Sequence, residues 1–465
     1  MRRPLIGYLL RAVLIAAIGG GTFSASGKDF YVDPQHGDPA NDGSKDRPWR
    51  SLQEVFAQGL IESQKWPSLP YRAGFQLVER NPGAPVRAGD TIYLRSGNYG
   101  ELVIQGYYNR DLITIAAEPG HQPHFTRIRI VAGCRWVLKG LHVHPDGEPA
   151  SRPGVLVDIQ SHGWQGPVHD VVVEDCRLFS AEDSASWSAE QWNERAWDGI
   201  RADGERIVIR RNYLKNVNFG ISVSGPHALV EHNVVENFAG DGLRGLGDYG
   251  VFQYNLVKNC YDVNQNHDDG FQSWTVGPEG VGSGQVKGVV LRGNVIINYE
   301  DPNQPHRGAL QGIGCFDGMF VDWVVENNVV IVDHYHGITL GGAVGCRIVN
   351  NTVVDPRAGR PGPAAVRIGP HKKGTLSRQC VVRNNLASAL DVRGEEMIVD
   401  HNVIVDEPAR FFRNLAVADL HLLRGCPAID VGTAEFAPST DIEGTARPQG
   451  AQVDVGAYEY AADRN

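Results

Sequence analysis

The stretch RIVIRRNYLKNVNFGISVSGPHALVEHNVVENFAGDGL, residues 206–243, contains the pattern that determines the fold. It holds two copies of a short unit, one around Asn212 and one around Asn233, and the run RIVIRR before the first copy alternates as a half-buried strand does. The unit recurs around Asn255, Asn294, Asn328, Asn351, Asn385 and Asn402. Successive asparagines are 21, 22, 39, 34, 23, 34 and 17 residues apart. The shorter spacings match one coil of a parallel β-solenoid, and the longer ones match a coil with an inserted loop.

A second unit, an apolar residue directly after glycine, follows the asparagines in DGI (198–200), FGI (219–221), DGL (241–243), DGF (269–271), RGA (307–309) and HGI (336–338). Two units in fixed order predict stacked coils, and hence an all-β chain folded as one single-stranded right-handed parallel β-helix. We expect the asparagines to form an internal amide ladder, which is a structural role. The 55 glycines are about 12% of the chain against about 7% in average usage, and we expect them to accept the positive φ of tight corners.

Composition narrows the function classes. The chain has 465 residues with 44 basic and 54 acidic side chains, a net charge of −10. Without residues 1–27, which hold three arginines and no acid, the net charge is −13. Such a balance argues against a nucleic-acid-binding protein, which needs a basic surface. An apolar content of 42% and a charged content of 21% exclude wholesale disorder.

Residues 1–27 have the order of a secretory signal peptide: Arg2 and Arg3, an apolar run strongest at 12–18, then small residues. An uncleaved anchor is the alternative, and no later stretch approaches membrane-spanning length. We therefore expect a secreted or periplasmic protein, soluble after cleavage and monomeric. Its seven cysteines are odd in number and include no C-x-x-C pair, which favours buried core residues and leaves one disulfide open.

The remaining chain divides into two parts. We expect residues 28–410 to form the β-helix. Within them, the segment 51–60 has helical periodicity and is expected to cap the first coil. Residues 180–197 are an inserted loop or helix. Residues 411–465, where the repeat fades, form a C-terminal extension that packs on the β-helix.

Segments near the start and near the end of residues 28–465 resemble known proteins. The segments FYVDPQHGDPANDGSKDRPWRSLQEV (30–55) and RAGDTIYLRSGNY (87–99) resemble the opening of right-handed parallel β-helix carbohydrate enzymes of the pectin-lyase-like superfamily. CPAIDVG (426–432) and DIEGTARPQGAQVDVGAYEY (441–460) are similar to the terminal segment of exported bacterial β-helix proteins. The resemblance implies the fold more strongly than a substrate.

The centre, GDGLRGLGDYGVFQYNLVKNCYDVNQNHDDGFQSW (240–274), resembles the calcium site of family-nine pectate lyases. The resemblance implies that Asp241, Asp268 and Asp269 bind a catalytic Ca²⁺. Two positions depart from the family: its additional aspartate is Gln272 here, and its catalytic lysine falls on Thr339 in HGITLGG (336–342).

Aligning the coils on the glycine of the second unit predicts a column of stacked residues: Asp198, Phe219, Asp241, Asp269, Arg307 and His336. Neighbouring strands lie about 4.8 Å apart, so Asp241 and Asp269 are expected side by side. Two such carboxylates repel each other unless a cation bridges them, one is protonated, or an arginine compensates. Calcium prefers hard oxygen ligands of this kind.

The same alignment assigns roles. Arg307 and His336 are the candidates for the catalytic base, and histidine is the easier base at neutral pH. Arg244, counted with the catalytic group, and Arg201 suit substrate carboxylates because guanidinium is a planar fork. Further candidates for contact with the substrate are the aromatic residues Trp274 and Tyr335, together with His306.

We therefore expect a calcium-assisted lyase that cleaves an acidic, uronate-containing polysaccharide by β-elimination. One alternative is a β-helix glycoside hydrolase of polygalacturonase type, with Asp241 and Asp269 as acid and base. Others are a uronate C5-epimerase and a solenoid that binds glycans without catalysis. An unsaturated product identifies the lyase, activity with a chelator and saturated ends identify the hydrolase, and unchanged chain length identifies the epimerase.

Overall fold

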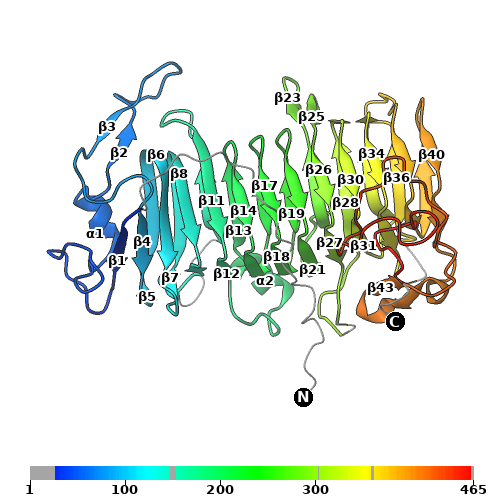
Figure 1. Ribbon diagram of the computed structural model, residues 1–465, viewed down its shortest axis with the longest axis horizontal. Coiled ribbons are helices and arrows are strands. Elements are labelled where there is room, and N and C mark those ends of the chain that lie inside the picture. Colours follow the sequence, from blue (N-terminus) through cyan, green and yellow to red (C-terminus); the bar gives the residue numbers. More distant parts are fainter. Residues whose placement is uncertain (1–26, 147–152, 302, 358–360, 462–465) are drawn as a thin grey trace.

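The computed structural model describes residues 27–146, 153–301, 303–357 and 361–461. Its strands stack coil upon coil into one right-handed parallel β-helix with three faces (Figure 1), as the repeats predict. Each coil runs through face 1, then face 2, then face 3. The expected signal peptide falls almost wholly outside the described residues. None of the helices within these ranges is both long enough and apolar enough to cross a membrane.

Face 1 consists of β10 (Val155–Gln160), β13 (Asp198–Asp203), β16 (Ile221–Val223), β19 (Leu243–Gly245), β22 (Asp269–Trp274), β28 (Gln311–Asp317), β32 (His336–Gly341), β36 (Ala365–Gly369) and β39 (Ala389–Val392). Face 2 consists of β1 (Asp29–Val32), β4 (Thr91–Leu94), β11 (Val168–Glu174), β14 (Val208–Arg210), β17 (Leu229–Glu231), β20 (Val251–Gln253), β26 (Val290–Arg292), β30 (Val324–Glu326), β34 (Arg347–Val349), β37 (Val381–Arg383) and β40 (Ile398–Asp400). Both faces continue into the long strands β6 (Glu101–Ala117) and β8 (Arg127–Lys139).

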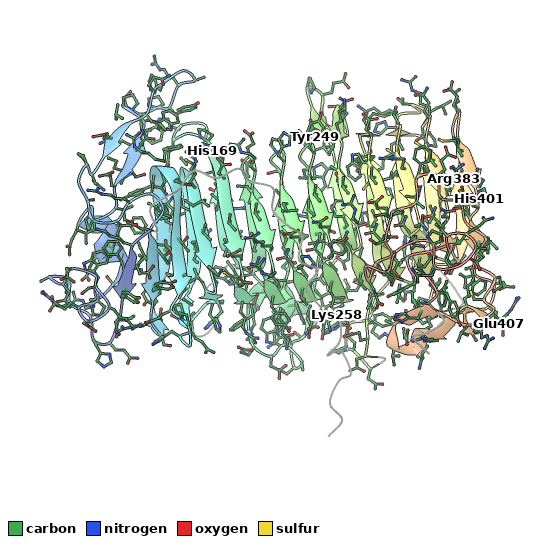
Figure 2. The ribbon with its side chains drawn as sticks, in the orientation of Figure 1. His169, Tyr249, Lys258, Arg383, His401 and Glu407 are labelled. Atoms are coloured by element: carbon green, nitrogen blue, oxygen red, sulfur yellow. The ribbon has the colours of Figure 1, made fainter. Side chains whose placement is uncertain are left out.

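Face 3 consists of β5 (Gly97–Asn98), β7 (Pro123–Phe125), β9 (His142–Val143), β12 (Arg177–Phe179), β15 (Tyr213–Val217), β18 (Val234–Phe238), β21 (Leu256–Cys260), β27 (Val295–Ile297), β31 (Val329–Ile331), β35 (Thr352–Val354), β38 (Leu386–Ala387) and β41 (Val403–Ile404). Smaller elements are β2 (Ser63–Lys65), β3 (Val78–Arg80), β23 (Val276–Gly277), β24 (Gly280–Val281), β25 (Gln285–Lys287), β29 (Met319–Val321), β33 (Ala343–Val344), β42 (Phe412–Asn414), β43 (Asp419–Leu422), α1 (Leu52–Ala57), α2 (Ala189–Arg195) and the 3₁₀ helices Pro408–Arg410 and Leu415–Val417. Figure 2 shows Tyr249, between faces 1 and 2, at the opposite edge from Lys258 on face 3.

The repeat asparagines form the expected ladder at the corner between faces 2 and 3. Each side-chain amide donates to the side-chain oxygen of the next asparagine, from Asn212 to Asn402, at 2.9–3.0 Å. Each also donates to a main-chain carbonyl, as Asn294 does to Phe252 at 2.8 Å. All but the last, half-buried asparagine are buried, so their polar groups are satisfied without water.

The glycines that begin face 1 are needed for space and not for conformation. A Cβ on Gly242 would lie 2.3 Å from Val257 Cγ1, and one on Gly270 would lie 2.4 Å from Ile296 Cγ2. Neither glycine has a positive φ. The expectation of positive φ is therefore wrong for this column. In the neighbouring corner, residues with side chains adopt it, including Arg211 and His232, both with a φ of 54°.

A helix caps the start of the β-helix, and the C-terminal segment packs on one of its faces. At the start, α1 is capped by the Ser51 hydroxyl and buries Leu52 and Val55 in the main core of Val, Ile and Leu. At the other end, the C-terminal segment turns back over face 3 (Figure 1), where Phe411 and Leu420 join a second core with Val354 of β35. All seven cysteines lie within the described ranges, buried and outside any disulfide.

Candidate functional site

The candidate residues gather where face 3 turns into face 1, at the starts of β19, β22, β28 and β32. Strand pairing aligns Leu243 with Phe271, which confirms that Asp241 and Asp269 lie on adjacent coils. Asp269 then pairs with Gln311, and Ile313 pairs with Ile338 of the next coil. The column is therefore Asp241, Asp269, Gln311 and His336.

Arg307 does not belong to this column, and the alignment that placed it there is wrong. Its RGA triplet lies in a loop before β28, and the glycine in register is Gly312. The guanidinium carbon of Arg307 lies 3.6 Å from the Tyr299 ring centroid, in the same loop. His306 Nε2 lies 3.0 Å from the carbonyl of Trp187, in the segment that contains α2. These contacts hold both side chains in the loop before β28.

Arg244 compensates Asp241 directly. The Arg244 Nε donates to Asp241 Oδ2, and the Asp269 amide donates to Asp241 Oδ1 at 3.1 Å. The guanidinium carbon lies 3.7 Å from the Phe219 ring centroid and 5.4 Å from that of Trp274. Burial raises the pKa of Asp241, and Arg244 opposes that rise. The positive charge of Arg244 thus balances the negative charge of Asp241.

Asp269 and Asp268 are buried acids that favour the protonated form. Burial, and then the neighbouring Asp241, raise the pKa of Asp269 well above its ordinary value. Burial raises the pKa of Asp268 to about 8. Gln272 Nε2 donates to Asp269 Oδ2 at 2.9 Å. The Oδ1 atoms of both aspartates are buried without a hydrogen-bond partner among the described residues.

These aspartates do not fit a calcium ion in this arrangement. Both oxygens of Asp241 already accept hydrogen bonds, one of them from Arg244. Within the described residues, Asp241, Asp268 and Asp269 do not offer three oxygens within 4.8 Å of one another. A calcium cage needs several converging oxygens, whereas here the Arg244 guanidinium donates to one oxygen of Asp241 and the Gln272 amide to one oxygen of Asp269.

Arg201 and Trp274 lie on the outer surface of face 1. The Arg201 Nε and Nη2 each donate to Asp158 at 3.1 Å, so this fork is already paired with a buried carboxylate. Trp274 ends β22 with its ring half-buried beside Arg244. Trp274 therefore places an aromatic ring beside Arg244, close to Asp241.

His336 lies two coils from Asp269, a separation of about 10 Å at the usual strand spacing. Its Nδ1 is 2.9 Å from Thr339 Oγ1, and its ring centroid is 4.1 Å from that of the 39% exposed Tyr335. Burial, followed by the charges of His334 and Arg367, lowers the pKa of His336 to about 3. At neutral pH the imidazole is therefore uncharged.

Arg367 was missed by the sequence reasoning. It follows Thr339 in the outward column, and its guanidinium carbon lies 5.1 Å from the Tyr335 ring centroid. Its Nη2 pairs with Asp391 at 2.9 Å. The signal was AVRIG (365–369) as the next coil after HGITLG, but Ala365 stands there in place of the glycine used for alignment. The site thus has two groups: Asp241, Asp268, Asp269 and Arg244 (the acid group), and His336, Tyr335 and Arg367 (the histidine group).

Comparison with known proteins gives similarity at the level of solved structures. No protein-family model matches the chain, and no curated protein matches its sequence. Pectate lyase Pel9A is 16% identical with a TM-score of 0.38, over 94% of this chain and 97% of that chain. A rhamnogalacturonan lyase is 15% identical with a TM-score of 0.43, over 84% and 91%. The GH136 lacto-N-biosidase from Eubacterium ramulus is 13% identical with a TM-score of 0.34, over 81% and 68%. Identities and TM-scores this low carry no argument about the activity of this chain.

Proposed function

We propose that the protein is an exported polysaccharide lyase that cleaves a uronate-containing chain by β-elimination at the histidine group. The observation that carries the proposal is an uncharged, half-buried His336, oriented through Nδ1 by Thr339 and placed beside Tyr335 and Arg367. A base, a hydroxyl and a guanidinium are the three groups that this elimination needs.

The reaction moves one proton to the base and one to the leaving oxygen. His336 Nε2 takes the proton from C5 of the uronate, and the electron pair of that bond forms the C4–C5 double bond. The bond from C4 to O4 breaks, and the Tyr335 hydroxyl protonates the departing oxygen. Arg367 pairs with the uronate carboxylate through N–H groups other than the Nη2 that pairs with Asp391, which makes the C5 proton more acidic and spreads the charge that develops. Solvent then returns a proton from His336 to Tyr335.

The substrate itself tunes the base. The lowered pKa of His336 in the free protein results from burial and then from nearby positive charge, including Arg367. A bound carboxylate neutralises that charge and adds a negative charge beside the imidazole, so the pKa of His336 rises toward the range that suits a base at neutral pH. An acidic substrate therefore activates the histidine, whereas a neutral glycan does not.

The acid group takes part in binding. Arg244 lies between the rings of Phe219 and Trp274, which supplies flat surface for sugar stacking beside a positive charge. Its charge is shared with Asp241, so we assign it a supporting contact with a second uronate and not the proton transfer. Calcium, expected from the sequence, has no step in this scheme.

Incubation of the purified protein with a panel of uronate polymers, with and without a chelator, tests the proposal. We expect an ultraviolet-absorbing unsaturated product in both conditions. His336→Gln should reduce kcat by about 10²- to 10⁴-fold, which is the usual contribution of a general base. The matched control is His232→Gln, because His232 is exposed on the other side of the coil and stacks on Tyr254. Full activity in His336→Gln, or no unsaturated product from any polymer, would overturn the proposal.

A glycoside hydrolase is a second candidate, supported by one observation. Asp268 keeps its proton at neutral pH, since its pKa is about 8, and a protonated carboxyl is the general acid that glycoside hydrolysis needs. This reaction leaves saturated reducing ends and survives His336→Gln but not Asp268→Asn. The two candidates are therefore separated by product and by variant.

A further inference from the structure

We infer that the outer surface of face 3, near the start of the β-helix, holds a binding site for one divalent transition-metal ion, formed by His124, His144 and Asp146. One possible ligand atom from each of the three residues lies within 4.8 Å of the other two. The site is independent of the proposed lyase chemistry, because it lies on β7 and β9, several coils before Asp241.

The three ligands come from two neighbouring coils. His124 lies on β7 in register with His142 of β9, and His144 and Asp146 follow directly after β9. The His124 and His144 ring centroids are 3.6 Å apart, and His124 Nε2 is 3.5 Å from Asp146 Oδ1. A metal ion here would therefore join adjacent coils through side chains.

Neighbouring groups orient two of the three ligands, Asp146 and His144. Asn98 Nδ2 donates to Asp146 Oδ2 at 2.7 Å, which leaves Oδ1 directed at His124. His144 Nδ1 is 3.2 Å from the Pro145 carbonyl, so a hydrogen there leaves the Nε2 lone pair available. Metal-binding histidines characteristically donate their second ring nitrogen to a carbonyl or carboxylate in this way.

One ring has to turn when the ion binds. The two imidazoles are nearly parallel, 9° apart, and parallel rings cannot both direct a lone pair at one ion. His144 is held from its other side by Phe179, with a centroid distance of 4.4 Å. His124 is therefore the ring that turns. Its Nε2 donates a hydrogen to the carbonyl of His144, 2.9 Å away, and this hydrogen moves through solvent to Nδ1, so that the Nε2 lone pair can bind the metal.

The ligand set selects the class of metal. Two imidazoles and one carboxylate suit Zn²⁺, Co²⁺, Ni²⁺ or Cu²⁺, whereas Ca²⁺ and Mg²⁺ prefer sites built wholly from oxygen. Three protein ligands leave the fourth position of a tetrahedral ion to water.

Calorimetric titration of the full, metal-free chain with Zn²⁺ alone tests the inference, and Co²⁺ provides a visible spectrum that reports imidazole ligation. We expect one equivalent to bind, with no competition from excess Ca²⁺. His124→Gln should abolish the binding, and Asn98→Ala should weaken it by about 10- to 100-fold, as loss of an orienting partner does. His227→Gln, at an exposed ring on another corner, is the matched control and should bind as the unaltered chain does.

Circular dichroism confirms that each variant is folded before titration. Three results would overturn the inference: no zinc binding by the unaltered chain, an undiminished equivalent in folded His124→Gln, or displacement of zinc by calcium. None of these results bears on product formation, so the lyase proposal stands or fails separately.

Discussion

Replacing Asn328 by alanine removes one rung from the middle of the amide ladder. The Asn328 Nδ2 donates to Asn351 Oδ1 and to the Leu291 carbonyl, both at 2.9 Å. Its Oδ1 accepts from the main-chain amide and the side-chain Nδ2 of Asn294, at 2.9 and 3.0 Å. The truncation therefore breaks four hydrogen bonds.

The cost follows from burial. Asn328 and Asn351 have no exposed surface and Asn294 has 4%, so water cannot replace the lost partners. At about 1 kcal/mol for each hydrogen bond, four of them make the variant less stable by about 4 kcal/mol. Asn402→Ala breaks four comparable bonds at the half-buried end of the ladder, where water substitutes, and we expect a loss of about 1 kcal/mol.

Urea unfolding followed by circular dichroism measures both free energies of unfolding, with the slope against urea compared to verify that the same surface is exposed. The reasoning fails if Asn328→Ala lowers the free energy of unfolding by less than about 1 kcal/mol, because the loss of four buried hydrogen bonds should lower it by more. It also fails if the two variants lose equal stability, because water access would then be irrelevant.

Two further predictions concern the corner of face 1. Gly270→Ala places a Cβ against Ile296 and should cost about 1–3 kcal/mol in the same unfolding assay, whereas Gly369→Ala, with no atom within 4 Å of its Cβ, should be nearly neutral; equal effects would contradict the packing argument. Because the pKa of Asp268 rises from 3.8 to about 8 on folding, its contribution to stability is complete below about pH 4 and is lost as the pH rises to about 8. Asp268→Asn should therefore raise the unfolding midpoint above that of the unaltered chain by more at pH 8 than at pH 4. A difference between the two proteins that is the same at both pH values would count against the raised pKa.

The fold was predictable because its strongest signal is local and repeated. A buried asparagine must have partners, and an asparagine recurring at coil spacing can obtain them from its own copies, as Asn212 and Asn233 do. The capping helix at the start of the β-helix was also predictable, since Ser51 precedes an apolar pattern of helical period.

The site was predictable only in part, because coil length varies and spacing alone does not fix register. RGA (307–309) and QGI (311–313) both match the glycine pattern, and only strand pairing shows that the second is in register. Arg367 was missed because Ala365 stands in its coil in place of the glycine used for the alignment. The pairing of Arg244 with Asp241 depends on three-dimensional charge compensation, whereas the pattern alone predicts calcium as the partner of Asp241 and a substrate carboxylate as the partner of Arg244.

The C-terminal segment over face 3 has a consequence for the way the chain is made. Synthesis proceeds from the N-terminus, so β31, β35 and β38 are made before residues 411–461, which cover them. Until then the outward side chains of these strands, including Ile331 and Val354, are an exposed apolar strip. A chain cut short before residue 411 retains that strip and is open to capture by proteases and chaperones. Residues 411–461 therefore cover the apolar strip only after they have been synthesised.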